Sequence, residues 1–133
     1  MKMTRKMAAV VFVAGSGLAL QFALAQGPIV KRIELQRHDM GTPGLEAVQF
    51  RVDYNPGAAI PRHSHPGEEI TYILEGSLEL EIDGKPTATL KAGDVFFIPA
   101  GTIHAAKNAG TTNAAAITTY VVEKGKPLVI PAK

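Results

Sequence analysis

Three of the four histidines in the sequence occur at spacings that suit a metal site. His63 and His65 are two residues apart, so on a β-strand both imidazoles project from the same face. Glu69 opens the next expected strand, and its carboxylate can return to the same point. His104 follows a tight Pro-Ala-Gly turn and can supply a third imidazole from a distant hairpin. Three imidazoles and one carboxylate suit iron, manganese, nickel, copper or zinc, and they leave positions open for water or substrate.

These residues belong to two longer patterns of fixed spacing. The first runs glycine, five residues, His-x-His, three residues, glutamate, six residues, glycine, and its anchors are Gly57, His63, His65, Glu69 and Gly76. The second runs glycine, five residues, Pro-x-Gly, two residues, histidine, three residues, asparagine, and its anchors are Gly93, Pro99, Gly101, His104 and Asn108. Together they resemble the two motifs of the cupin superfamily, in particular its small single-domain secreted members (monocupins, cupin type 2).

The resemblance implies both a fold and a ligand set. Cupins are all-β double-stranded β-helices, or jelly-roll barrels, and the implied site holds one divalent transition metal in one mouth of the barrel. The implied ligands are His63, His65, Glu69 and His104. Glu68 adjoins Glu69 and is the other candidate for the carboxylate, but the spacing to the following glycine favours Glu69. His38 lies outside both motifs, in a polar run that we expect to be a surface loop.

The pattern of the remaining chain also predicts an all-β protein. Turn residues recur every eight to twelve positions and no long segment has a 3.6-residue period. Apolar and polar residues alternate from Val48 to Tyr54 and from Leu78 to Ile82, where Asp83-Gly84 predicts a hairpin turn. Leu128 to Ile130, between two prolines, predicts an edge strand on this barrel or on a partner. Further strands are expected over 29–35, 70–74, 87–90, 95–98, 103–106 and 114–122. Such elements close only as a sandwich or a small barrel.

The first 25 residues differ from the rest. A basic start, an apolar run and the small-residue site Ala23-Leu24-Ala25 predict a cleaved secretory signal peptide. A membrane anchor is the alternative, but an apolar run of about 18 residues is near the lower limit for a spanning helix. We therefore expect residues 26–133 to form a single cupin domain with its core at about 46–122. We expect this domain in the bacterial periplasm, with no membrane segment after cleavage.

Charge and composition exclude several classes of function. Three of the 14 basic residues and none of the 12 acidic ones lie in the leader, so the mature chain has 11 basic and 12 acidic residues and a net charge of −1. Nucleic-acid binding therefore lacks an electrostatic basis. The chain has no cysteine, which excludes disulfides, thiolate zinc sites and iron–sulfur clusters.

Fold and ligand set do not fix a reaction, because the resembled family includes dioxygenases, decarboxylases, lyases, isomerases and proteins that only bind. Our first hypothesis is a small metalloenzyme of the dioxygenase-like type, an oxidoreductase that acts on a small oxygen-rich molecule chelating the metal. The alternatives are a metal-dependent lyase or isomerase acting on a small sugar acid, and a non-catalytic periplasmic protein that binds a metal or ligand. No catalytic residue is assigned, and the candidates beside the metal are Tyr54, Arg62, Glu68 and Tyr72. We expect a small-molecule ligand and, as in similar single-domain cupins, a homodimer.

Overall fold

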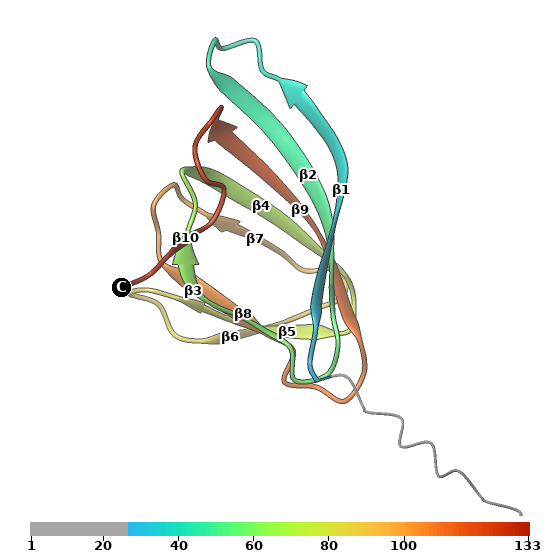
Figure 1. Cartoon of the computed structure of the whole chain (residues 1–133). Coiled ribbons are helices and arrows are strands. Elements are labelled where there is room, and N and C mark those ends of the chain that lie inside the picture. Colours follow the sequence, from blue (N-terminus) through green and yellow to red (C-terminus); the bar gives the residue numbers. More distant parts are fainter. Residues whose placement is uncertain (1–26) are drawn as a thin grey trace, which may run out of the picture.

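The computed structural model describes residues 27–133, and the predicted leader lies outside the described residues. In this part of the chain ten strands build the fold (Figure 1). They are β1 (Val30–Asp39), β2 (Leu45–Tyr54), β3 (Ala59–Ser64), β4 (Gly67–Glu75), β5 (Ser77–Ile82), β6 (Ala88–Lys91), β7 (Val95–Ile98), β8 (His104–Lys107), β9 (Ala114–Glu123) and β10 (Ile130–Pro131).

The strands form two antiparallel sheets that face each other (Figure 1). The first sheet has the order β1-β2-β9-β4-β7, and the second has the order β10-β3-β8-β5-β6. Several neighbours in each sheet come from distant parts of the chain, as when β9 pairs with both β2 and β4. This is the all-β jelly-roll arrangement that the sequence predicted.

The hydrophobic core lies between the two sheets. It is supplied by alternate residues of the strands, because successive side chains of a strand point to opposite faces. Val52 of β2, Ile73 of β4 and Leu78 of β5 are at most 2% exposed. On β9 the inward positions nearest them are alanines, Ala114 and Ala116, which are almost fully buried.

One prediction about the first strand was wrong. β1 continues to Asp39, well beyond the predicted end at residue 35, and His38 lies in this strand opposite Ala47 of β2. A bulge between Glu34 and Gln36 shifts the register, after which the ladder continues. The polar run carried no apolar alternation, so the sequence indicated a loop. Backbone pairing to β2 nevertheless keeps this exposed segment extended.

The C-terminal tail completes the second sheet of its own chain. Ile130 lies opposite Ser64 and Pro131 opposite His63, and the Ala132 N–H donates to the Arg62 carbonyl at 3.0 Å. Of the two positions left open for the tail, the structure therefore shows the one on this barrel. Within residues 27–133 no helix is both long and apolar enough to cross a membrane.

Candidate metal centre

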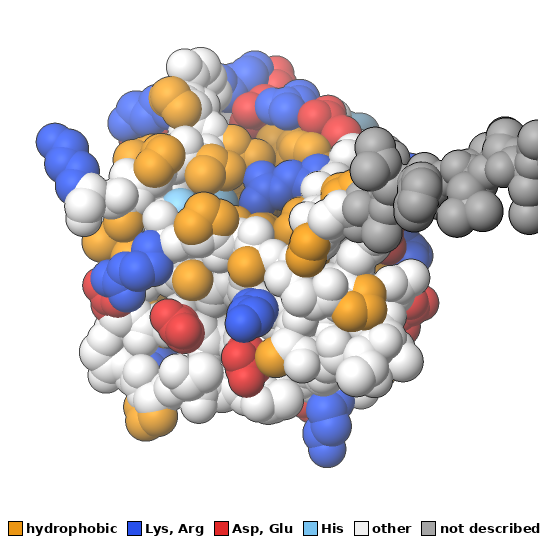
Figure 2. All heavy atoms as spheres, turned by 60° about the horizontal axis from the view of Figure 1, so that its bottom comes forward, with side chains coloured by type: hydrophobic (Ala, Val, Ile, Leu, Met, Phe, Trp, Pro, Cys, Tyr) orange, Lys and Arg blue, Asp and Glu red, His pale blue; other side chains and the backbone are white. Residues whose placement is uncertain are grey.

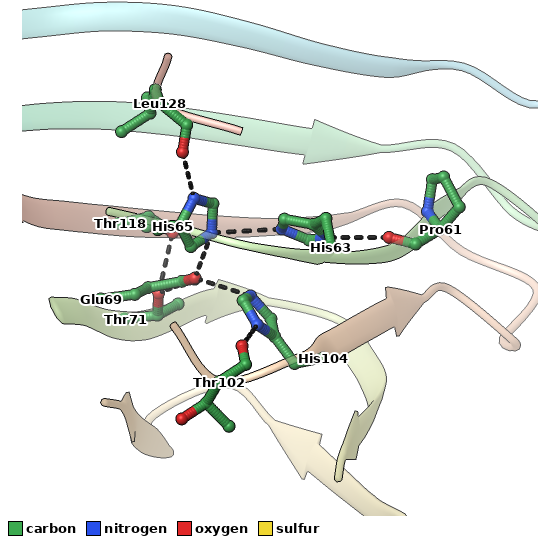
Figure 3. Close-up of polar contacts among 9 residues, drawn as sticks. All are labelled: Pro61, His63, His65, Glu69, Thr71, Thr102, His104, Thr118 and Leu128. Atoms are coloured by element: carbon green, nitrogen blue, oxygen red, sulfur yellow. Dashed lines mark hydrogen bonds and ion pairs between the residues drawn. The ribbon is translucent and has the colours of Figure 1, made fainter. Parts of the chain in front are cut away.

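Four ionisable side chains converge between the two sheets (Figure 3). His63 lies on β3, His65 follows that strand directly, and His104 begins β8. β3 and β8 are neighbours, with His63 opposite His104, whereas Glu69 comes from β4 of the facing sheet. The turn before β8 holds the segment after β3 in place, because the Gly101 N–H donates to the His65 carbonyl at 3.0 Å.

All four side chains are buried and close together. His63, His65, Glu69 and His104 are 4%, 1%, 6% and 3% exposed. The Nε2 atoms of His63 and His65 are 3.1 Å apart. The Glu69 Oε2 atom lies 3.0 Å from Nε2 of His65 and 3.0 Å from Nε2 of His104. One nitrogen from each histidine lies within 4.8 Å of the others.

The second nitrogen of each ring is held by a backbone carbonyl (Figure 3). Nδ1 of His63 is 2.7 Å from the Pro61 oxygen, and Nδ1 of His104 is 2.9 Å from the Thr102 oxygen. Nδ1 of His65 is 2.6 Å from the oxygen of Leu128, in the C-terminal tail. A carbonyl only accepts, so each Nδ1 carries a proton and donates it, and each Nε2 of a neutral ring presents a lone pair. Such second contacts orient histidines that bind metals.

The arrangement of lone pairs is consistent with one transition metal ion. When the rings are neutral, the Nε2 lone pairs of His63 and His65 face each other at 3.1 Å and repel, and burial denies them water as an alternative partner. A cation at the point of convergence removes this repulsion. Three imidazole nitrogens and a carboxylate oxygen are ligands that zinc, iron, manganese, nickel and copper accept in proteins. The residues present therefore fit such an ion.

The protonation of the metal-free cluster follows from burial and from the carboxylate. Burial lowers the pKa of His63 to about 4, because its protonated form would lose hydration beside two other rings. Burial acts to raise the pKa of Glu69, but the hydrogen bonds from His104 and His65 outweigh it and lower that pKa to about 2. Burial likewise opposes protonation of His104, yet the contact with Glu69 raises its pKa above the ordinary value. Without metal, the contact with Glu69 thus favours a proton on His104.

A hydroxyl chain supports the carboxylate from the first sheet. The Thr71 hydroxyl donates to Glu69 Oε1 at 3.0 Å and lies 2.9 Å from the Thr118 hydroxyl on β9 (Figure 3). Both Glu69 oxygens are therefore engaged. Tyr120 of β9 packs its ring 4.6 Å from the ring of His65.

A narrow cavity of about 10 Å³ lies beside the cluster, room for about one water molecule. Apolar side chains form much of its wall, and His63, His104, Glu69, Tyr54, Tyr120 and Arg32 also line it. A larger hollow of about 480 Å³ lies along β3, β5 and β8, lined by residues such as Pro61, Glu79 and Lys107. None of the four clustered side chains lines that hollow, so we assign the chemistry to the interior cavity.

The four predicted neighbours of the metal have different positions. Tyr54 is 5% exposed and lines the cavity. Burial, with a smaller effect of Glu69, raises the pKa of Tyr54. Glu68 and Tyr72 lie on β4 at the positions that alternate with the buried ones, and both are exposed. Arg62 is exposed and forms an ion pair with Asp83 at 2.8 Å. Of the four, the structure brings only Tyr54 to the site.

Sequence reasoning missed other residues that contact or line the site. Thr71 lies two residues after Glu69, and Thr118 and Tyr120 are alternate inward residues of β9. Because the sequence shows the period of both strands, alternation could have indicated all three. Arg32 lies on the mostly exposed β1, where the alternation is weak. The Leu128 carbonyl had no signal in the sequence, because a backbone acceptor does not depend on residue type.

Comparison with known proteins identifies the family. The model of the cupin domain matches residues 50–122, more than half of the chain. The chain therefore belongs to the cupin domain family.

Curated relatives and solved structures share parts of this chain. A germin-like protein 5-1 of Oryza sativa subsp. japonica is 38% identical over 86 residues, which are 59% of this chain and 39% of the relative. DMSP lyase DddQ from Ruegeria pomeroyi has a TM-score of 0.59 and 28% identity, over 65% of this chain and 43% of that one. A recombinant oxalate oxidase in complex with glycolate has a TM-score of 0.59 and 25% identity, over 82% and 57%. The chain spans about two fifths of the length of the first curated relatives it matches.

Proposed function

We propose that this cupin is a metal-dependent enzyme of the dioxygenase-like type, an oxidoreductase acting on a small oxygen-rich acid that binds the metal directly. The observation that supports this best is the convergence of three Nε2 atoms and one carboxylate oxygen in a buried cavity. A transition metal bound there would supply a Lewis acid and, if redox-active, an electron carrier. The proposed ligands are His63, His65, Glu69 and His104.

The chain's own residues suit such chemistry. Backbone carbonyls fix the three rings, and Thr71 fixes the carboxylate, so the ligands are held in place before the metal arrives. Apolar side chains form much of the wall of the cavity, and such surroundings strengthen electrostatic contacts inside. Tyr54 is protonated at neutral pH, and burial raises its pKa further, so it can donate a hydrogen bond to a bound oxygen.

The similar structures support the substrate class. The oxalate oxidase is described in complex with glycolate, a two-carbon hydroxy acid, and it covers most of this chain. The interior cavity of this chain is narrow, so a small acid of that kind needs the least movement of the surrounding side chains. We therefore propose short hydroxy, keto or dicarboxylic acids as the substrates.

A lyase is the second candidate, and the likeness to the DMSP lyase favours it. In this case the metal would polarise the acid and a side chain would move a proton. Tyr54 is the predicted shuttle residue that lines the cavity. Because burial raises its pKa further above neutral pH, Tyr54 stays protonated and is a poor base for removing a proton from a carbon acid.

Turnover with and without oxygen separates these functions. The purified protein, loaded in turn with iron, manganese, nickel, copper and zinc, is mixed with short hydroxy, keto and dicarboxylic acids. An oxidoreductase consumes oxygen and substrate together, and a lyase forms product under anaerobic conditions. His104→Ala should abolish either activity, whereas His38→Ala, at an exposed histidine of β1, should preserve it. Metal and acid binding without product in any condition would contradict both enzyme functions and favour a binding protein.

We further propose that the protein is exported to the periplasm and forms a homodimer. The leader pattern in residues 1–25 supports export. N-terminal sequencing of periplasmic material should give Gln26, and a chain that keeps Met1 in the membrane fraction would contradict export.

A cluster of exposed apolar side chains on the outer face of β4 and β7 supports the dimer: Ile70, Tyr72, Leu74, Val95 and Phe97.

A further inference from the structure

Arg32 places a positive charge in the wall of the metal cavity. It lies on β1 opposite Val52, a core residue that is 2% exposed, so its side chain leaves the strand toward the interior. It lines the same cavity as His63, Glu69 and His104. Figure 2 shows a face of the molecule on which hydrophobic side chains gather and basic and histidine atoms are visible among them.

Arg32 differs from the other arginines of the described chain in having no acidic partner. Arg37 pairs with Glu34 and Glu46, Arg51 pairs with Asp53, and Arg62 pairs with Asp83. Across residues 27–133, no side-chain hydrogen bond or ion pair of comparable length involves the Arg32 guanidinium.

The acidic residue of the cavity is already engaged. One oxygen of Glu69 accepts a hydrogen bond from Thr71, and the other contacts two histidines. Glu69 therefore does not need Arg32 as a partner. Arg32 and Glu69 are the two cavity-lining residues whose side chains are ordinarily charged. When a divalent metal occupies the histidine cluster, the lining has a net positive charge, and a ligand that brings one or two negative charges balances it.

The chemistry of the guanidinium defines that ligand further. Its planar fork donates two parallel hydrogen bonds to a carboxylate, and these charge-assisted contacts are stronger than neutral ones. The cavity of about 10 Å³ holds about one water, so an acid enters only if a side chain moves. Arg32 is long, flexible and only half-buried on β1, and it can move without breaking an ion pair.

We propose that Arg32 is the carboxylate anchor of this site: it binds the carboxylate of a small acid while another oxygen of the same acid binds the metal. This inference rests on the proposed function, because it requires the metal in the histidine cluster. On this proposal, the protein selects substrates that carry a carboxylate at one end and an oxygen ligand for the metal at the other.

Calorimetric titration of the zinc-loaded protein tests the anchor without turnover. Glycolate is the charged probe, and glycolamide is its neutral counterpart of nearly equal shape. Arg32→Gln should weaken glycolate binding by about tenfold to a hundredfold, the range for losing hydrogen bonds to a charged group. Lys31→Gln removes the same charge from the adjacent, outward and exposed residue, and it should change glycolate affinity less than twofold. Glycolamide affinity should be the same in all three proteins.

A second variant and the zinc content keep the test decisive. Arg32→Lys keeps the charge but loses the paired donors, so it should weaken glycolate by about threefold to tenfold even if Arg32→Gln fails to fold. The anchor is refuted if the wild type holds zinc but does not bind glycolate, if neither Arg32 variant weakens glycolate, or if Lys31→Gln weakens it equally. Wild-type protein that takes up no zinc or other transition metal would instead refute the proposed function, and the anchor with it.

Discussion

A buried histidine must satisfy two ring nitrogens, and each histidine of this site does so in the same way. One nitrogen donates to a carbonyl of the backbone, and the other points at a shared centre. The carbonyls of Pro61 and Thr102 lie two residues before His63 and His104, so a local backbone bend fixes both rings. His65 depends on Leu128, which is 63 residues away, and its orientation is therefore a property of the folded tail.

The pKa of His63 predicts acid-sensitive stability of the metal-free protein. Its folded pKa is about 4 and its unfolded pKa is about 6.5, so the unfolded chain binds more protons between these values. The free energy of unfolding should fall as pH decreases from about 6.5 to 4, by an amount on the order of 3 kcal/mol. The pKa of His104 is raised, so its effect on stability changes at pH values above this window. The pKa of Glu69 is about 2, so its contribution to stability is lost mainly at pH values below the window.

Urea denaturation with a chelator present, repeated across this pH range, measures the effect. His63→Gln should flatten the profile between pH 6.5 and 4, and His38→Gln, at an exposed strand position, should leave it unchanged. A wild-type stability that is constant across this range would contradict burial of a neutral His63.

At the residue scale the sequence predicted what spacing encodes. The spacing of two predicted that His63 and His65 point to the same place. The structure shows this although β3 ends at Ser64, and it brings Glu69 and His104 to the same point. Glu68, Arg62 and Tyr72 were candidates by proximity in sequence, but period two turns them outward. Arg32 could not be found, because the register of β1 against β2 decides which of its residues face inward.

β4 is the element that joins the two halves of the site. It carries Glu69 and Thr71, and it lies between β9 and β7. Its first residue, Gly67, faces the β9 backbone so closely that an added Cβ would lie 1.9 Å from the Val121 carbonyl oxygen. Glycine is needed here because the backbones approach closely, since Gly67 does not have a positive φ.

Gly67→Ala should therefore separate β4 from β9 and lower the free energy of unfolding by about 3 kcal/mol or more. Gly41→Ala is the control, because nothing lies within 4 Å of its Cβ position, and it should change stability by less than about 1 kcal/mol. Thermal denaturation of the two variants beside the wild type measures this. Equal midpoints for the two variants would contradict the close approach.

The C-terminal tail predicts a second effect at this scale, on metal affinity. A chain ending at Val129 keeps the Leu128 carbonyl and loses β10, whereas a chain ending at Lys126 loses both. The shorter chain should bind zinc at least about tenfold more weakly than the longer one, because His65 loses the acceptor that orients it. Competition with a chromophoric chelator measures both affinities, and equal values would show that the carbonyl does not matter for metal binding.

The elements were predicted well where alternation was clear and less well elsewhere. The strand from Val95 to Ile98 was predicted at its observed bounds, and most of the other predicted strands lie within one to three residues of theirs. No range was predicted for β3. The end of β1 was missed because pairing, and not composition, keeps its polar half extended. Whether the tail forms an edge strand on this barrel or on a partner was left open, since two residues of pairing carry no sequence signal.

In the described residues, the outer face of the first sheet carries an extended apolar surface. Ile70 lies opposite Phe97 and Tyr72 opposite Val95, and these side chains are 47–67% exposed. Exposed apolar patches of several large side chains mark interaction sites. The tail, predicted as a possible edge for a partner, pairs within its own chain, so this surface is the stronger basis for a dimer.

Light scattering after gel filtration should give the mass of two mature chains at micromolar concentration. The double change Val95→Glu and Phe97→Glu places charges in the proposed interface and should give a monomer. Lys85→Glu, in the exposed turn between β5 and β6, should leave the dimer intact. A single-chain mass for the wild type, or a dimer in the double variant, would contradict this interface.

The central claim is that the barrel holds one transition metal through the histidine cluster, and elemental analysis of the purified protein tests it most directly. We predict close to one metal ion per chain, severe loss on replacing His63, His65 or His104 by alanine, and full retention in His38→Ala. The fourth histidine is the matched control because it is exposed on β1, outside the cluster. Full metal content in any two of the three cluster variants, or wild-type protein that takes up no transition metal, would contradict the account.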